Sequence, residues 1–259
     1  MIVSGRFMEF VALILIWVLA MIAIDKIKKG WTVSFRRIAG LDALEEAVGR
    51  AAEMGRPVHF TSGLNSLTGT WAPLTVAGLA VFGEVARLCA RYRVPVIYSV
   101  YGTQVIPIAH ELYKQAFLAE GRPEEAKPEE AIRYLSSSQF AYAAAVQGIA
   151  ERERPAANIM VGPFYAESLI FAETFYRVGA IQVAGTARLY QIPFFAIVGD
   201  YVLIGEECYA AGAYLTKDPA HTGSLFVQDL GKMVAIVLGV IGALLTTAGT
   251  KAIVEFLKL

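Results

Sequence analysis

The sequence predicts an α/β protein: a Rossmann-like, doubly wound, mostly parallel sheet flanked by N- and C-terminal transmembrane helices. Short apolar runs alternate with helical patterns through the middle of the chain, and a longer apolar run lies near each end. Strands buried on both faces form continuous apolar runs, as the strands of parallel sheets do. A hydrophobic content of 56% over 259 residues exceeds that of ordinary soluble domains.

Residues 1–29 are expected to form an N-terminal transmembrane anchor. The run from Phe7 to Ile24 carries one charged residue, Glu9, and is long enough to span a hydrocarbon core of ~30 Å. Three lysines follow within residues 26–29, whereas only Arg6 precedes the run. The positive-inside rule then places the N-terminus outside and the following domain in the cytoplasm. A cleaved signal peptide is the alternative, but its basic residues would precede the apolar run.

Residues 225–259 are expected to form a second transmembrane or interfacial helix. The stretch from Met233 to Gly249 has no charged residue. It is close to the shortest length that spans, so a tilted or interfacial placement is the alternative. Small residues at 239, 242, 243 and 246 suit close helix packing in lipid. The tail over 251–259 is amphipathic and suits the membrane interface.

Residues 30–224 are expected to form a cytosolic Rossmann-like domain, which opens with a helix over 41–54. Apolar side chains recur there at helical spacing, and Gly55 ends the helix. The apolar, β-rich runs at 57–62 and 94–100 are predicted strands, each followed by a helical pattern, over 73–92 and 106–121. The polar run over 121–134 is predicted to be solvated, with one helical turn starting at Pro128.

The second half of this domain repeats the alternation. Helices are predicted over 140–152, 166–179 and 201–215, and strands over 158–164, 180–185 and 193–200. The run over 189–204, LYQIPFFAIVGDYVLI, is also apolar enough to suggest a third membrane span. Pro193, Gly199 and Asp200 interrupt it and favour the strand and helix.

A small-ligand site is predicted at the carboxyl ends of the strands, where ligands of open α/β sheets meet helix N-termini. The predicted site residues are Thr61, Ser62, Gly63, Asn65, Ser99, Tyr101, Glu167, Gly185, Thr186 and Asp200. Glu167 and Asp200 are the acid–base candidates. The same small and hydroxyl residues also suit ordinary strand-to-helix turns, so a purely structural role is the alternative.

Known fingerprints do not define the chemistry or a cofactor. The loop SGLNSLTGT, residues 62–70, lacks the Gly-Lys-Ser/Thr ending of a P-loop and the glycine spacing of a dinucleotide site. The three histidines share no metal-ligand spacing, so no metal site is expected. Equal numbers of acidic and basic residues, 23 each, argue against nucleic-acid binding. Cys89 and Cys208 suit buried thiols in a reducing compartment.

The run RRIAGLDALEEAVGRAAEMGRPVHF, residues 36–60, directly follows the first membrane helix. It resembles the start of an uncharacterised family of prokaryotic membrane proteins assigned only a domain of unknown function. The resemblance implies a prokaryotic, membrane-anchored protein. It implies no substrate, cofactor or catalytic residue.

These features favour a membrane-anchored, homo-oligomeric assembly or scaffold protein, whose partners are membrane lipid, further copies of the chain and a small-molecule ligand. Small-residue helix faces and the lack of a reactive cluster motivate this hypothesis. The alternatives are a nucleotide- or metabolite-sensing module and an enzyme acting on a membrane-proximal substrate. A pore is disfavoured because neither span carries a central ionisable residue.

Overall fold

The computed structural model describes residues 7–34 and 36–249, which form two compact units. One unit combines residues 7–34 with residues 216–249, and the other is residues 36–215. The domain boundary drawn from the sequence between residues 224 and 225 lies inside a helix of the first unit. The interfacial tail over 251–259 lies outside the described residues.

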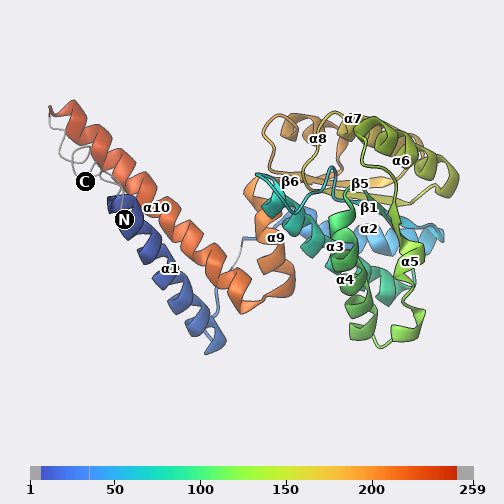
Figure 1. The fold of residues 1–259 in the computed structure, drawn as a ribbon, viewed down its shortest axis with the longest axis horizontal. Helices are drawn as coiled ribbons and strands as arrows, with labels where there is room; N and C mark the ends of the chain where they lie inside the picture. The colour runs from blue at the N-terminus through green and yellow to red at the C-terminus, as the bar shows by residue number, and fades with distance from the viewer. Residues whose placement is uncertain (1–6, 35, 250–259) are drawn as a thin grey trace. The chain divides into compact units, whose positions relative to one another are not determined.

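The second unit is built on a six-stranded sheet in which every neighbouring pair is parallel, in the order β3-β2-β1-β4-β5-β6 (Figure 1). The strands are β1 (Val58–Thr61), β2 (Val96–Val100), β3 (Ile132–Tyr134), β4 (Ala157–Val161), β5 (Ile181–Thr186) and β6 (Tyr201–Ile204). The residues of β1, β2 and β4 are all buried, as expected for central strands covered on both faces. The predicted mixed α/β class with a parallel sheet is confirmed.

Helices cover both faces of the sheet (Figure 1). One face carries α2 (Ala39–Met54), α3 (Ala72–Tyr92), α4 (Ile106–Ala119) and α9 (Glu206–Thr216), and the other carries α6 (Gln139–Glu153), α7 (Glu167–Arg177) and α8 (Ile192–Val198). The connections include the single turns η1 (Thr103–Val105), η2 (Pro123–Glu125) and α5 (Pro128–Ala131). Each face has its own apolar cluster.

Local sequence explains how these elements begin and end. The apolar stripe of α2 buries Leu41, Leu44 and Val48, and Gly55 ends the helix in the left-handed conformation with φ of 62°. Proline stands in the first turn of α3 and of α4, where no amide hydrogen is needed. The predicted helices over 41–54, 73–92 and 106–121 therefore agree with the structure within a few residues.

The prediction is wrong for residues 193–204. The predicted strand over 193–200 is mostly helix α8, because Pro193 occupies its first turn and fixes a helical φ. The next residues, YVLI, which were assigned to a helix, form β6 instead, and α9 starts only after Gly205, whose φ is 58°. The edge strand β3 was missed because its three residues lie in a polar run.

Within residues 7–34 and 36–249, three helices are long and apolar enough to cross a membrane: α1 (Phe7–Lys28), α3 and α10 (Pro219–Thr247). Most of α3 is buried within the second unit, where it packs against the sheet and α4. Its apolar length is therefore explained by core packing. The other two helices make up the first unit.

The helices α1 and α10 pack against each other in antiparallel orientation. The carboxyl end of α1 meets the start of α10. A Cβ added at Gly223 would lie 2.7 Å from Ile24 Cγ1, and the rings of Trp31, which follows α1, and Phe226 lie 4.8 Å apart. Asp218 caps α10 by accepting from the amide of His221 at 3.1 Å. The end of α1 and the start of α10, where the chain connects to the α/β unit, therefore lie close together.

Candidate functional site

The order of the strands reverses between β1 and β4, because the chain first adds β2 and β3 on one side and then β4, β5 and β6 on the other. In open parallel sheets a crevice commonly forms between the two loops that leave such neighbouring strands. Here the two loops contribute Ser62, Gly63 and Asn65 after β1 and Glu167 after β4. Of the predicted site residues, Ser62, Gly63 and Asn65 therefore lie at this point, where the loop after β1 meets Gly162 and Pro163.

The two loops touch at backbone level. A Cβ added at Gly63 would lie 2.4 Å from the carbonyl oxygen of Pro163, and one added at Gly162 would lie 2.3 Å from the carbonyl oxygen of Ser62. The amide of Leu64 also donates to the Pro163 oxygen at 3.0 Å. Glycine is required because no side chain fits between the loops. Backbone atoms therefore occupy the centre of the crossover.

The loop after β1 uses its amides within the protein. A phosphate cradle needs several free amides that point at one spot. The amides at positions 63, 64, 66, 67 and 68 instead donate to Thr61 Oγ1, Pro163 O, Thr75 Oγ1, Gln104 Oε1 and Ser66 Oγ, at 3.0 to 3.3 Å. This stretch is a strand-to-helix connection whose donors hold the loop in place.

Two buried hydroxyl clusters join the predicted residues across the sheet. On the α3 face, Ser62 Oγ lies 2.6 Å from the hydroxyl of Tyr98 and accepts from Asn65 Nδ2 at 2.9 Å. The Asn65 oxygen accepts from the Gly102 amide at 2.7 Å. Burial raises the pKa of Tyr98, so its hydroxyl stays protonated. Asn65 thereby ties the loops after β1 and β2 together.

On the opposite face, Tyr142 from α6 joins the next set. Its hydroxyl donates to the carbonyl of Ser99 at 2.9 Å and lies 2.6 Å from Thr61 Oγ1. The ring of Tyr101 packs edge-on against it, with centroids 5.6 Å apart. Thr61, Ser99 and Tyr101 are therefore brought together around Tyr142, which lies outside the predicted site because it belongs to a helix.

A buried polar row centred on His59 crosses four strands and was also missed. The Nδ1 atom lies 2.8 Å from Asn158 Oδ1, and Nε2 lies 2.8 Å from Ser99 Oγ. Because an amide oxygen only accepts, Nδ1 carries the proton and Nε2 accepts from the serine hydroxyl. Asn158 continues the row toward Gln182 of β5 at 3.4 Å. Burial lowers the pKa of His59 to about 4, so the ring is neutral.

The remaining predicted residues are dispersed. Glu167 is buried and accepts from the Tyr165 amide at 2.9 Å and from Gln139 Nε2 at 2.7 Å. Asp200 precedes β6 and accepts from the Gln182 amide at 2.8 Å, at the amino end of the sheet. The two acid–base candidates, Glu167 and Asp200, therefore lie at opposite ends of the sheet. The error followed from assigning residues 193–200 to a strand, which would have put Asp200 at a carboxyl end.

The last two predicted residues lie at the end of β5. A Cβ added at Gly185 would lie 2.9 Å from Leu203 Cβ, so this glycine permits close packing of β6. Thr186 is buried, and its Oγ1 accepts from the amide of Arg188 at 3.2 Å. Both residues have structural roles here.

Arg188 is a basic residue at the carboxyl end of the sheet, and the predicted site does not include it. Its guanidinium lies 3.4 Å from the ring centroid of Tyr165 and 5.1 Å from that of Trp71, and its Nη1 donates to the Phe164 carbonyl at 3.1 Å. Its Nε is buried and has no hydrogen-bond partner among the residues that the structure describes. No carboxylate pairs with it within residues 7–34 and 36–249. The rings and the carbonyl stabilise a charge that has no counter-ion in the described part of the chain.

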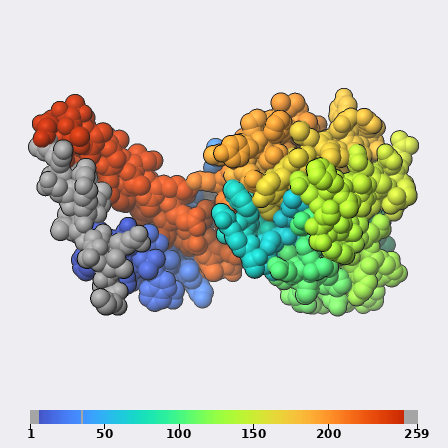
Figure 2. All heavy atoms as spheres, turned by 45° about the horizontal axis from the view of Figure 1, so that its top comes forward, coloured from blue at the N-terminus to red at the C-terminus, as the bar shows by residue number. Residues whose placement is uncertain are grey.

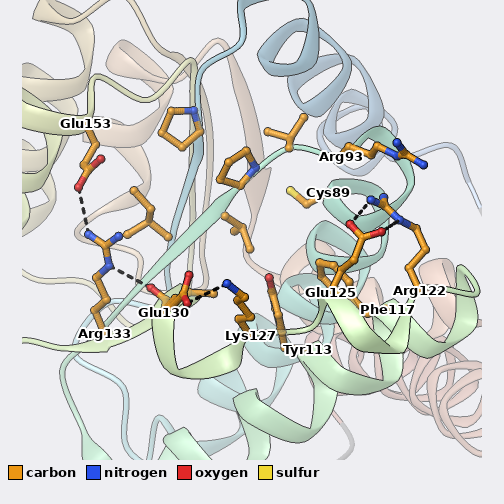
Figure 3. Close-up of a pocket in the computed structure, with 16 residues that line it drawn as sticks. Cys89, Arg93, Tyr113, Phe117, Arg122, Glu125, Lys127, Glu130, Arg133 and Glu153 are labelled. Carbon is orange, nitrogen blue, oxygen red and sulfur yellow. Dashed lines mark hydrogen bonds and ion pairs between the residues drawn. The ribbon is translucent and has the colours of Figure 1, made fainter.

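A cavity of about 430 Å³ lies at the other end of the sheet, beside the amino ends of β1 and β2 (Figure 3). Its wall includes Val96, Ile97, Tyr113, Phe117 and Cys89, and its rim carries Arg93, Arg122, Lys127, Arg133, Glu125, Glu130 and Glu153. This volume falls in the range of small-ligand sites. Burial raises the pKa of Cys89, so its thiol is protonated and unreactive.

Most of the charged groups on the rim of this cavity already have partners (Figure 3). Arg133 pairs with Glu153 at 3.2 Å, and Lys127 pairs with Glu130 at 3.2 Å. Arg122 pairs with Glu125 and also donates to the last turn of α3, where cations complement the helix dipole. These pairs explain the basic side chains structurally, unlike Arg188 at the opposite end.

The described residues contain no group of three or more His, Cys, Asp or Glu side chains placed to hold a metal ion.

A family model described as a domain of unknown function, DUF6754, matches residues 1–257. The chain belongs to the DUF6754 family. The resemblance inferred from residues 36–60 to a family of unknown function is thereby confirmed. No curated protein and no solved structure matched this DUF6754 chain.

Proposed function

We propose that this DUF6754 protein is a membrane-anchored, homo-oligomeric assembly protein of a prokaryotic cell. In this proposal α1 and α10 cross the membrane and hold copies of a Rossmann-like domain on its cytoplasmic side. The outward surface of the α1–α10 pair carries the proposal. Large apolar side chains such as Leu13, Trp17 and Leu244 are 65 to 66% exposed there. A soluble monomer rarely exposes so continuous an apolar surface, whereas lipid covers it without cost.

The helix lengths support two crossings. The 22 residues of α1 extend roughly 33 Å, close to the hydrocarbon thickness of ~30 Å. The 29 residues of α10 extend roughly 43 Å, so its polar first half reaches beyond the hydrocarbon. Asp229 and Lys232 pair at 3.0 Å within that half. The uncharged half from Met233 to Thr247 extends roughly 22 Å, so it would occupy most of the hydrocarbon core, with Lys232 near one edge.

The charge pattern supports a cytoplasmic domain. Lys26 and Lys28 occupy the last turn of α1, and Lys29 follows. Antiparallel packing puts the start of α10 at this same end of the pair. Both helices then enter the membrane from the basic side, which the positive-inside rule assigns to the cytoplasm.

The strand order supports the finer fold assignment. An all-parallel sheet in the order 3-2-1-4-5-6 is the arrangement of Rossmann domains.

Gly239 in α10 supports the association of copies. A Cβ added there meets no atom within 4 Å, so this glycine is not used to pack α10 against α1. Glycine on a lipid-facing surface permits close approach of another helix.

Carbonate washing and mass measurement test the proposal together. Alkaline carbonate should leave the intact chain in the membrane, and light scattering in mild detergent should give a multiple of the chain mass. Gly239→Leu should lower that multiple, while Gly231→Leu, a substitution at another glycine with open space outside the proposed span, should not. Release by carbonate, or a detergent mass of one chain, contradicts the proposal.

Ligand sensing is a second candidate, and the 430 Å³ cavity favours it. Thermal-shift screening with nucleotides and phosphorylated metabolites tests this role, because a ligand that binds only the folded state raises the melting temperature. Stabilisation that is lost in Lys127→Ala would locate the ligand in the cavity. Stabilisation that survives this change, or none at all, counts against it.

A further inference from the structure

The segment from Leu189 to Gly199, LYQIPFFAIVG, combines an outward apolar surface with a lack of charge over eleven residues. Leu189, Tyr190 and Ile197 are 77 to 81% exposed, and Phe194 is 40% exposed. They lie on and just before α8. The segment that contains α8, light orange in Figure 2, forms part of the surface of the α/β unit. We call the segment 188–199 the α8 surface. Scattered apolar residues are normal on proteins, but four exposed large apolar side chains within nine residues indicate a binding face.

The α8 surface is held in position by its inward side. Phe195 is 1% exposed, and its ring packs edge-on against Phe164 with centroids 5.2 Å apart. The amide of Phe195 donates to Gln191 O at 3.1 Å, and Gln191 in turn accepts from Ser168 Oγ at 2.8 Å. The outward residues are therefore displayed by a packed helix.

Arg188 starts the α8 surface and supplies its charge. Other arginines of the α/β unit, such as Arg87 and Arg133, pair with glutamates. Arg188 has only a carbonyl and two aromatic rings as partners among the described residues. A guanidinium binds phosphate and carboxylate groups well through its fixed fork of donors. An anionic group outside the α/β unit would therefore complete its interactions.

We infer that the α8 surface docks on the lipid surface of the membrane that anchors the chain, with Arg188 bound to anionic headgroups. This inference rests on the proposed anchoring by α1 and α10. Apolar and aromatic side chains beside a basic residue suit the interface between headgroups and acyl chains. Tethering by the two helices holds the α/β unit close to the bilayer, so a weak surface contact suffices.

A second copy of the chain fits this surface less well than lipid. A symmetric pair would place the α8 surface against itself. Residues 188–199 contain one cation and no carboxylate, so two copies of Arg188 would meet without an acceptor. Lipid phosphates supply that acceptor, and their acyl region covers the apolar residues.

Single-cysteine labelling of the full chain tests the contact. Cys89 and Cys208 are at most 1% exposed, so cysteines introduced by Tyr190→Cys or Ile197→Cys should take a fluorescent maleimide selectively. Leu118→Cys is the control, because Leu118 is 63% exposed on α4, which covers the face of the sheet opposite to α8. Each labelled protein is reconstituted in phosphatidylglycerol or phosphatidylcholine vesicles that contain spin-labelled quencher lipid.

Docking predicts stronger quenching at positions 190 and 197 than at 118, most strongly in phosphatidylglycerol. Arg188→Gln should reduce the preference for phosphatidylglycerol about fivefold, since a basic residue at an anionic surface contributes about 1 kcal/mol. Arg188→Lys should retain most of it. Equal quenching at all three positions overturns the inference, as does shielding that rises only with protein density and indicates a second copy. Equal quenching in both lipids overturns the headgroup contact.

Failure of the inference and failure of the proposed anchoring are distinguishable. If the labelled chains resist carbonate extraction but positions 190 and 197 are not quenched, the anchoring stands and the docking is wrong. If carbonate releases the chains, the anchoring itself is wrong, and the docking inference falls with it.

Discussion

Replacing His59 by glutamine should remove much of the acid sensitivity of the α/β unit. The neutral ring is fully buried between Asn158 and Ser99 and stacks on Phe175, with ring centroids 4.6 Å apart. Burial lowers its pKa from 6.5 to about 4. In the unfolded chain His59 therefore binds a proton near pH 6.5, whereas in the folded chain it binds one only near pH 4.

The sign and size of the effect follow from this difference. The folded state has its full stability above pH 6.5, and it loses stability as the pH falls from 6.5 to 4. The whole loss is about 3 kcal/mol, of which about 2 kcal/mol falls between pH 7 and pH 5. His59→Gln should be less stable at pH 7 by about 1 to 3 kcal/mol, because a hydrogen bond in the polar row is lost. It should lack the further fall of about 2 kcal/mol at pH 5.

The assay is urea unfolding of the detergent-solubilised chain at pH 7 and pH 5. Hydrogen–deuterium exchange of the peptides that contain β1 and β4 reports on the sheet itself. The matched control is His110→Gln, which removes a histidine of α4 that lies outside the polar row. An equal fall in stability between the two pH values in wild type and in His59→Gln would refute the role assigned to His59.

Three further predictions concern packing. Gly63→Ala should lower the unfolding free energy by more than about 2 kcal/mol, because Gly63 has a positive φ and an added Cβ would clash at 2.4 Å. Gly55→Ala, at a glycine with a similar φ but open space, should lower it by about 1 kcal/mol. Equal melting temperatures of the two variants would contradict this prediction. Gly223→Leu should separate α1 from α10 and lower the melting temperature in detergent, while Gly231→Leu, at a glycine with open space, should not. Tyr142→Phe should cost about 1 to 2 kcal/mol in urea titrations, and no change would argue against its hydroxyl bonds.

Much of the α/β architecture could be predicted from the sequence. The strands β1, β2, β4 and β5 are short apolar runs between helical patterns, and full burial is what makes them continuous. Glycine and proline marked several helix ends correctly, including Gly55 after α2. These local signals coincide with the tertiary structure, so a single sequence was sufficient.

Residues 189–204 could not be assigned because their periodicity is ambiguous. A short apolar run suits a buried strand, a helix or a membrane segment equally well. Tertiary packing of Phe195 decides for helix at α8, and pairing with β5 decides for strand at β6. The edge strand β3 was hidden for a similar reason, since it has three residues and its stability comes from its pairing with β2.

The candidate site was predicted in part. Thr61 and Ser99 lie side by side as expected, since parallel strands end at one edge, and both bind Tyr142. The partners that define their chemistry, Tyr142 from a helix and His59 from mid-strand, depend on side-chain contacts between distant segments. The sequence carries no local sign of such contacts. A polar residue inside an otherwise apolar strand, such as His59 in PVHFTS, is the signal that could have suggested the buried row.

The central claim, that two helices hold an α/β domain on the cytoplasmic side of a membrane, is tested most directly by accessibility from each side. The Phe140→Cys chain carries one exposed cysteine in the α/β unit, because Cys89 and Cys208 are buried. A membrane-impermeant maleimide should label it in inverted membrane vesicles and leave it unlabelled in intact cells. Labelling in intact cells would contradict the claim.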